Sequence, residues 1–326
     1  MLLKFFGFVD IFRAPQIEFS SMDEIEQHTP NIIIWAAPVM FLFVLIEWYI
    51  SKKQNHQLYE KKDSIGSICV GVGNVIINTL LKVSMFYIVI LIYNAIPWRM
   101  HFRWWTLIPC YLIFDLASYW SHRISHQQRF WWATHVVHHS SEQYNLTVSF
   151  RLSWMQNLKL IFFMPVMALS FHPIIFFITS QIAVLFQFWV HTEYIRKLHP
   201  VIEYLFATPS NHRVHHGSQE KYINKNYGAT FIFWDRLFGT YQPEEEQAEY
   251  GITSPVEHKM NPLYLNFHEY SDIWKDMKGA KGFKQKLFFL FGDPIDVARV
   301  KKNEISAPTL PVSHTLPLLN TAEVPA

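Results

Sequence analysis

Cysteine and charged residues are scarce in this chain of 326 residues, and it has no long basic tract. The two cysteines, Cys69 and Cys110, lie in apolar stretches without a CxxC motif, which excludes a disulfide scaffold and a cysteine-based zinc finger. Charged residues make up 17% of the chain and the net charge is +2, so the composition gives no support to a nucleic-acid partner. No glycine-rich loop has the spacing that cradles phosphates, so a Walker or Rossmann nucleotide site is also unsupported.

Hydrophobic residues, by contrast, make up 50% of the chain and come in long runs. Residues 32–50 and 65–93 are each long enough to cross a bilayer, and residues 104–120 form a third candidate span. Residues 158–190 are too long for one span and are broken at His172-Pro173, which predicts a hairpin of two short membrane helices. The predicted fold class is an all-α integral membrane protein with about four transmembrane or re-entrant helices.

Three histidine clusters carry the strongest chemical signal: an HxxxH motif at 122–126 and HxxHH motifs at 135–139 and 212–216. Because residues i, i+3 and i+4 share a helix face, each cluster presents its imidazoles together. The eight imidazoles, with His191 as a ninth, are too many for one four-coordinate site and suit two metals with open positions. Imidazole suits iron, zinc, copper or nickel, so the ligand type alone does not name the metal. The predicted metal ligands are His122, His126, His135, His138, His139, His191, His212, His215 and His216.

The orientation in the membrane follows from the loop after the first span, which carries Lys52, Lys53, Lys61 and Lys62 and is therefore expected to face the cytoplasm. With this multi-pass topology, all three histidine clusters form a helical cap on the cytoplasmic side. The membrane would be the cell membrane in a bacterium or the endoplasmic reticulum in a eukaryote. The predicted segments are an interfacial segment 1–31, a catalytic domain 32–242, a polar region 243–303 and a disordered tail 304–326.

Three further polar residues are candidate catalytic residues. Asp115 precedes His122 by seven residues and shares its helix face, so we expect its carboxylate to accept a hydrogen bond from a ligating histidine. Glu142 follows the second cluster closely and is either functional or a solvated loop residue. Asn211 directly precedes His212 and is either a helix N-cap or a hydrogen-bond donor beside the ligands.

The segment DLASYWSHRISH at 115–126 resembles the first histidine box of the fatty acid hydroxylase and sterol desaturase superfamily of membrane enzymes. Residues 135–139 resemble the second box and NHRVHH at 211–216 the third. More narrowly, five segments resemble the branch that contains alkylglycerol monooxygenase. They are HHSSEQYN at 138–145, FWVHTE at 188–193, TPSNHRVHHG at 208–217, KNYG at 225–228 and WDRLFGT at 234–240. The similarity extends over about residues 32–241 and is weaker beyond.

This resemblance implies a helical membrane fold, two iron ions, O2 as oxidant, and hydroxylation or desaturation of a lipid C–H bond. For the narrower branch it implies cleavage of the O-alkyl bond of glyceryl ethers by hydroxylation next to the ether oxygen, with tetrahydrobiopterin as electron donor. We therefore expect a membrane-bound non-haem di-iron monooxygenase. Its partners would be a lipid from the bilayer, O2, and an electron donor that is either a pterin or a redox protein.

Two other functions stay open at this point. Within the same superfamily, the enzyme could be a hydroxylase or desaturase of sterols, carotenoids or fatty acyl chains. A membrane metal transporter would belong to another class, and it predicts ligands scattered at mid-membrane depth. Here the histidines lie at helix ends in polar sequence, which disfavours transport.

Overall fold

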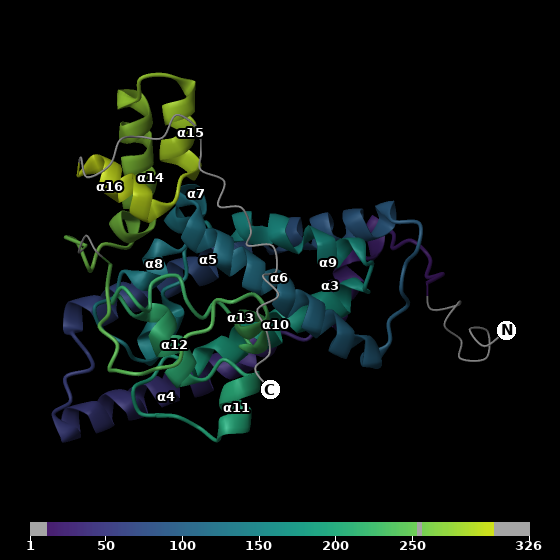
Figure 1. Ribbon diagram of the computed structural model, residues 1–326. Helices are drawn as coiled ribbons and strands as arrows, with labels where there is room; N and C mark the ends of the chain where they lie inside the picture. The colour runs from purple at the N-terminus through teal and green to yellow at the C-terminus, as the bar shows by residue number, and fades with distance from the viewer. Residues whose placement is uncertain (1–11, 253–255, 303–326) are drawn as a thin grey trace, which may run out of the picture.

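The computed structural model describes residues 12–252 and 256–302, and every regular element in these ranges is a helix (Figure 1). This agrees with the predicted all-α fold. The longer helices are α4 (Ile32–Gln54), α5 (Lys61–Ala95), α6 (Leu107–Gln127), α10 (Pro173–Phe188) and α14 (Pro262–Gly279). The shorter α-helices are α3 (Met22–His28), α7 (Arg129–Ala133), α8 (Val136–His139), α9 (Met164–Ala168), α11 (Pro200–Leu205), α12 (Pro209–His216), α13 (Phe233–Leu237), α15 (Phe283–Phe291) and α16 (Pro294–Lys301). The 3-10 helices are η1 (Phe19–Ser21), η2 (Trp104–Thr106), η3 (Leu146–Phe150) and η4 (Gln156–Phe163).

Local sequence explains where many of these helices begin. Five helices begin with a proline at the first helical position: α10, α11, α12, α14 and α16. In each of them the residue before the proline is the N-cap, and its side chain accepts a hydrogen bond from a backbone N–H of the first turn. Proline at this position removes no intrahelical hydrogen bond, and the capping side chain satisfies one of the free N–H groups. In α10 the cap is His172, so this histidine starts the helix.

Two of the described helices, α4 and α5, are long and apolar enough to cross a membrane. Both expose large apolar side chains, including Trp35 on α4 and Val75 and Leu80 on α5. Exposed apolar surface of this extent suits contact with lipid rather than water. The hairpin predicted at residues 158–190 contains one of its two expected α-helices. α10 forms the second arm, whereas the first arm consists of the 3-10 helix η4 and the short helix α9.

The central apolar cluster joins α5, α6, α9 and α10. Its buried members include Val89 of α5, Phe114 of α6 and Ile175 of α10. These helices run along one direction in Figure 1, together with α4, and the histidine-bearing helices α8 and α12 lie toward one end of them. The apolar helices therefore form a bundle that supports the histidines at one end.

The C-terminal helices α14 and α15 stand across this direction and pack on α7 (Figure 1). Arg129, the first residue of α7, is buried and donates to Glu269 at 2.6 Å and to Asp276 at 2.7 Å, both on α14. Because α7 lies between the first and second histidine clusters, this ion pair attaches the C-terminal helices directly to the segment that links the clusters. The N-terminal residues 1–11 and the predicted disordered tail 304–326 lie outside the described residues.

Candidate metal centre

The nine predicted ligands converge into two groups, and every member of both groups is a histidine. The five-histidine group consists of His122, His126, His135, His139 and His215. The four-histidine group consists of His138, His191, His212 and His216. Within each group the nitrogens that could bind a metal all lie within 4.8 Å of one another. In the part of the chain that the structure describes, these are the two groups of side chains that could hold a metal ion.

The histidines of each HxxHH motif are shared between the two groups, and sequence spacing alone does not predict this division. In the second cluster His135 and His139 join the five-histidine group, and His138 joins the other. In the third cluster the assignment is reversed: His212 and His216 stay together, and His215 crosses to the five-histidine group. Residues i and i+4 thus remain paired, as neighbours on one helix face should, while the i+3 imidazole contributes to the opposite group.

The tautomers of three histidines are fixed by backbone carbonyl groups. His122 donates from Nδ1 to the Tyr227 carbonyl at 2.8 Å, His215 to that of Lys225 at 3.0 Å, and His191 to that of Gln187 at 2.7 Å. A carbonyl oxygen only accepts, so each Nδ1 carries the proton and each Nε2 keeps its lone pair for a metal. Such hydrogen bonds from the other ring nitrogen are the usual support of metal-binding histidines.

The nitrogen–nitrogen distances test whether a metal fits. The Nε2 atom of His191 lies 3.1 Å from that of His138 and 3.0 Å from that of His212. In the other group, His215 and His139 approach to 3.1 Å. Ligands ~2.1 Å from one metal lie about 3.0–3.4 Å apart in octahedral or tetrahedral geometry, so these spacings suit a shared cation. The buried Nε2 atoms of His122 and His126 have no hydrogen-bond partner, which further suits ligation.

Burial keeps the imidazoles in the form that binds metals. It lowers the pKa of His191 and of His215 to about 4, and it lowers the pKa of His212 and His216 well below the ordinary value. Neighbouring histidines lower the pKa of His191, His212 and His216 further, because two imidazolium ions so close together would repel. All four side chains are therefore neutral at pH 7, as metal ligation requires.

The loop from Lys225 to Phe231 supports the five-histidine group from one side. Its carbonyl groups at Lys225 and Tyr227 accept from the two histidines named above, and Asn226 between them has a left-handed φ of 54°. Asparagine tolerates this conformation better than most residues. The Asn226 side chain also donates to the carbonyl of Asn211 at 3.0 Å, which ties the loop to α12.

Two buried carboxylates hold this loop in place. Asp235 accepts from the backbone N–H groups of Tyr227 and Gly228, each at 2.7 Å. Asp115 accepts from the N–H groups of Thr230 at 2.9 Å and Phe231 at 3.1 Å, and from the Trp234 indole. The predicted hydrogen bond from a ligating histidine to Asp115 is therefore wrong. The Asp115 carboxylate supports the histidines indirectly: it holds the loop whose carbonyl groups accept hydrogen bonds from His122 and His215.

Two other buried carboxylates hold the segments around the four-histidine group. Glu47 of α4 accepts from the hydroxyls of Tyr59 and Thr192 and from the N–H of Leu146 at 2.8 Å. Thr192 directly follows His191, so this contact anchors that ligand to α4. Asp63 of α5 likewise accepts from Arg151 at 2.7 Å and from Ser141, which lies just after the second cluster.

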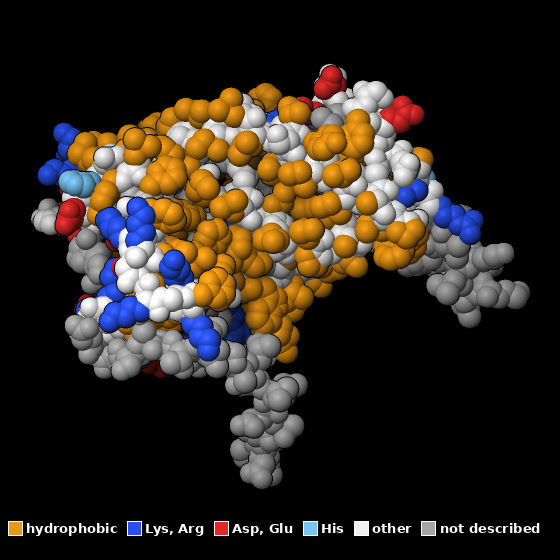
Figure 2. Space-filling view, turned by 90° about the horizontal axis from the view of Figure 1, so that it is seen from above, with side chains coloured by type: hydrophobic (Ala, Val, Ile, Leu, Met, Phe, Trp, Pro, Cys, Tyr) orange, Lys and Arg blue, Asp and Glu red, His pale blue; other side chains and the backbone are white. Residues whose placement is uncertain are grey.

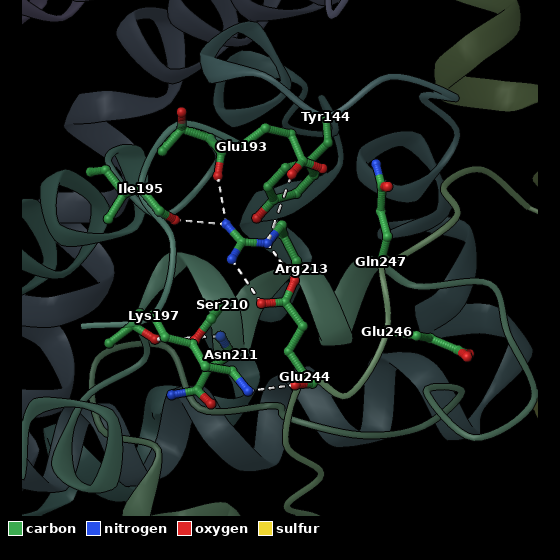
Figure 3. Close-up of polar contacts among 12 residues, drawn as sticks. Tyr144, Glu193, Ile195, Lys197, Ser210, Asn211, Arg213, Glu244, Glu246 and Gln247 are labelled. Atoms are coloured by element: carbon green, nitrogen blue, oxygen red, sulfur yellow. Dashed lines mark hydrogen bonds and ion pairs between the residues drawn. The ribbon is translucent and has the colours of Figure 1, made fainter. Parts of the chain in front are cut away.

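Arg213 fixes the orientation of α12 from within the third cluster. Its guanidinium donates to both carboxylate oxygens of Glu244, at 2.6 and 2.8 Å, and to the carbonyls of Thr192 and Ile195 (Figure 3). Burial alone would lower the pKa of Arg213, but the hydrogen bonds and negative charge of Glu244 raise it, so Arg213 remains charged. Arg213 directly follows His212 and lies two residues before His215. Holding its side chain in place therefore also keeps these two histidines directed toward their groups.

Two of the three candidate catalytic residues have other contacts in the structure. Glu142 is exposed and pairs with Lys259 at 2.7 Å, which matches the solvated alternative. The N-cap of α12 is Thr208, so the capping role considered for Asn211 is wrong. Asn211 is buried and donates to the carbonyls of Glu203 and Phe206, which connect α12 to α11.

Sequence reasoning missed two side chains beside the histidines. Tyr227 is fully buried, and its ring lies 5.4 Å from that of His126 and 6.0 Å from that of His215. Lys159 of η4 is only 6% exposed, and after burial its charge is the largest factor that lowers the pKa of His135. A lone lysine at the start of an apolar run was the signal that could have found Lys159.

Comparison with known proteins places all nine histidines in one family domain. Residues 106–240 match the family model described as fatty acid hydroxylase. The alkylglycerol monooxygenase of Xenopus tropicalis is 34% identical over 274 residues, which cover 82% of this chain and 60% of that protein. The human and Danio rerio alkylglycerol monooxygenases are each 32% identical, over 86% and 88% of this chain and 63% and 65% of their own lengths.

The chain thus spans about three fifths of the length of these relatives. No solved structure matches it. The family model covers all three histidine clusters and His191, and the similarity to the relatives extends over more than four fifths of the chain. The region that holds all nine histidines is therefore similar to the fatty acid hydroxylase family.

Proposed function

We propose that this chain is a membrane-bound non-haem di-iron monooxygenase that uses O2 to hydroxylate a lipid C–H bond. The observation that carries the proposal is the convergence of nine neutral histidines into two adjacent groups within a fatty acid hydroxylase domain. The five-histidine and four-histidine groups would each hold one iron ion. When bound, the iron ions would supply the activation of O2, which no amino-acid side chain provides.

The protein's own contribution is to hold and orient the ligands. The carbonyls of Lys225, Tyr227 and Gln187 fix the tautomers of three histidines. The buried carboxylates Asp115 and Asp235 fix the loop behind the five-histidine group. We therefore assign Asp115 and Asn211 positioning roles and Glu142 a surface role.

For the membrane placement, we propose that α4 and α5 span the bilayer, with α6 and α10 embedded beside them. The histidines lie at the same end of the bundle as the loop between α4 and α5, because Glu47 and Asp63 near that loop contact the histidine-bearing segments. Lys52 and Lys53 in this region favour the cytoplasmic side. A lipid chain could then reach the histidine groups laterally from the apolar part of the bundle.

The substrate class we favour is a glyceryl ether lipid, as the name of the alkylglycerol monooxygenase relatives suggests. Hydroxylation consumes one O2, two electrons and two protons, places one oxygen atom on the carbon and releases the other as water. At the carbon next to the ether oxygen, the product is a hemiacetal that breaks down to an aldehyde and glycerol. The electrons come from an external donor, for which we propose tetrahydrobiopterin, with a redox protein as the alternative.

The other candidate functions are distinguished by the geometry or by assay. A transporter needs ligands arranged along a path through the membrane, whereas these nine histidines converge at one end of the bundle. A sterol, carotenoid or acyl-chain hydroxylase or desaturase would use the same metal groups, so only substrate turnover separates it from ether cleavage.

The test is turnover by the purified full chain in detergent or nanodiscs after iron-replete expression. With O2 and reduced tetrahydrobiopterin, we expect aldehyde release from an alkylglycerol. His138→Ala should abolish this activity, whereas His258→Ala, which changes an exposed histidine outside both groups, should not. Protein without iron would contradict the di-iron proposal. Turnover of other lipids without aldehyde release would remove only the ether substrate, and activity with a redox protein alone would remove only the pterin.

A further inference from the structure

We propose that α14 and the start of α15 lie on the cytoplasmic surface of the bilayer and bind anionic lipid headgroups there. This inference rests on the membrane placement proposed above, because it concerns a surface that would otherwise face water. It assigns a role to the C-terminal helices, which hold none of the nine histidines.

The first observation is an exposed apolar stripe on α14. Leu263 is 60% exposed, Phe267 40% and Trp274 60%, and their spacing of four and seven residues places them on one face of the helix. Phe283, at the start of α15, is 73% exposed. The opposite side of α14 is held in the protein by buried Leu265 and Ile273. Large aromatic side chains left in water along one helix face are typical of interfacial helices.

The second observation is a set of lysines beside this stripe. Lys275, Lys278, Lys281, Lys284 and Lys286 are all exposed. Within the described part of the chain, Lys275 pairs with Asp272, and the other four form no ion pair. The nearby carboxylates pair elsewhere on the helices: Glu269 with Arg129, and Asp276 with Arg129 and Lys301. Figure 2 shows blue Lys and Arg side chains gathered where α14–α16 stand, next to a broad hydrophobic surface. Lysines that border an exposed apolar face suit anionic headgroups.

The third observation is the position along α5 at which α14 lies, relative to the part of α5 that would span the hydrocarbon core. The ring of Trp154 packs on Gly73, where an added Cβ would lie 2.4 Å from it, and its indole donates to the Val70 carbonyl. The same ring lies 6.2 Å from that of Phe267. From Gly73 to the end of α5 at Ala95 the helix rises about 33 Å, close to the ~30 Å of a hydrocarbon core. Phe267 therefore sits where α5 would leave the hydrocarbon.

The fourth observation is the direction of α14 and α15 relative to the long helices. In Figure 1, α14 and α15 run across the long helices, so they lie parallel to the plane of any bilayer that α4 and α5 cross. α5 also exposes apolar side chains next to this level, with Val72 just before Gly73 and Val75 and Ile76 just after it. An acidic soluble protein could also bind the lysines, but it would not explain an apolar stripe that is continuous with the lipid-facing side of α5. The bilayer is therefore the partner that the surface fits best.

The test uses the full chain in nanodiscs, with spin labels on single cysteines in a Cys69→Ser, Cys110→Ala background. Labels at Trp274→Cys and Asp272→Cys form a matched pair, because these positions lie two residues apart on nearly opposite sides of α14. A label at Val75→Cys reports whether α5 itself contacts lipid. The measured quantity is collision with O2, which concentrates in lipid, relative to a water-soluble nickel complex.

In nanodiscs that contain anionic lipid, we expect a several-fold higher O2-to-nickel ratio at position 274 than at 272. Replacing Lys278, Lys281, Lys284 and Lys286 with glutamine should remove the dependence of this ratio on anionic lipid. A label at 274 that stays water-accessible while the label at 75 contacts lipid would overturn this inference alone, as would protection of 274 only on addition of an acidic soluble protein. A water-accessible label at 75 would instead contradict the membrane placement itself. Size-exclusion profiles and metal content identify any variant that fails to fold.

Discussion

The two histidine groups differ in how closely the protein encloses them. All members of the four-histidine group are buried, and their nitrogens follow one another from His138 through His191 and His212 to His216 at 3.0–3.2 Å. In the five-histidine group His122, His126 and His135 are only partly buried. The four-histidine group thus offers four imidazoles to a metal, whereas the other group offers five.

This difference predicts unequal tolerance of ligand loss, which is the largest effect we expect. His212→Ala leaves three imidazoles in its group and should remove about one metal ion per chain, with activity lowered more than ~100-fold, beyond the effect of losing an outer hydrogen bond. His126→Ala leaves four imidazoles and should retain more metal. The measurement is metal content by mass spectrometry beside turnover. Equal metal loss in the two variants would contradict the unequal groups.

The next effect concerns the loop whose carbonyl groups accept hydrogen bonds from His122 and His215 of the five-histidine group. Asp235→Ala removes the acceptor for the Tyr227 and Gly228 N–H groups, so we expect ~10–100-fold weaker metal binding at that group. Buried N–H groups left without partners should also lower the free energy of unfolding by about 1–3 kcal/mol each. Metal titration followed by absorption or magnetic resonance would detect one weakened and one unchanged site.

Thr240→Val is the matched control for this variant. It removes the hydrogen bonds of the Thr240 hydroxyl to Asp235 and with Tyr119, but it keeps the carboxylate that accepts from the loop N–H groups. Its metal affinity should stay close to that of the unmodified chain. If Thr240→Val and Asp235→Ala were equally damaging, the loop would not depend on the carboxylate in the way described.

Much of the fold and the candidate ligands could be identified from the sequence, because both depend on short-range patterns. Runs of apolar residues predict α4 and α5, and proline after a capping residue marks the start of α10 and α12. The HxxHH spacing identifies candidate ligands, since imidazoles that share a helix face can point to one place.

The division into two groups could not be predicted, because it depends on how α6, α8 and α12 approach one another in space. The same limit explains Asp115. Its position seven residues before His122 correctly gives the helix face, but its partners, Thr230 and Phe231, lie more than a hundred residues away in the chain. Long-range hydrogen bonds of this kind leave no spacing signal.

In the metal-free protein, a lower pH should reduce the free energy of unfolding through histidines of both groups to a similar extent. His191 and His215, one from each group, have pKa values of about 4 in the folded chain and ~6.5 when unfolded, so folding favours the neutral form. Their contribution to stability is complete above pH 6.5 and is lost as the pH falls toward 4. Between pH 7 and pH 5 the free energy of unfolding should fall by about 2 kcal/mol for each such histidine.

Denaturant unfolding of chelator-treated protein measures this pH dependence. His191→Gln and His215→Gln should each reduce the slope by a similar amount. A stability that rises on acidification would mean that these histidines are charged in the folded chain.

The smallest effect is expected outside both groups. Glu142→Gln removes an exposed ion pair with Lys259, which is worth about 0–1 kcal/mol. Metal content and turnover should not change. A large loss of turnover with intact metal would instead give Glu142 a catalytic role.

The most direct test of the two-group description is the number of iron ions bound per chain of the full-length protein after iron-replete expression. Two separate histidine groups predict two iron ions per chain, falling to about one in His212→Ala. A single iron ion per chain, with no further loss in that variant, would contradict the proposal that the nine histidines form two metal sites.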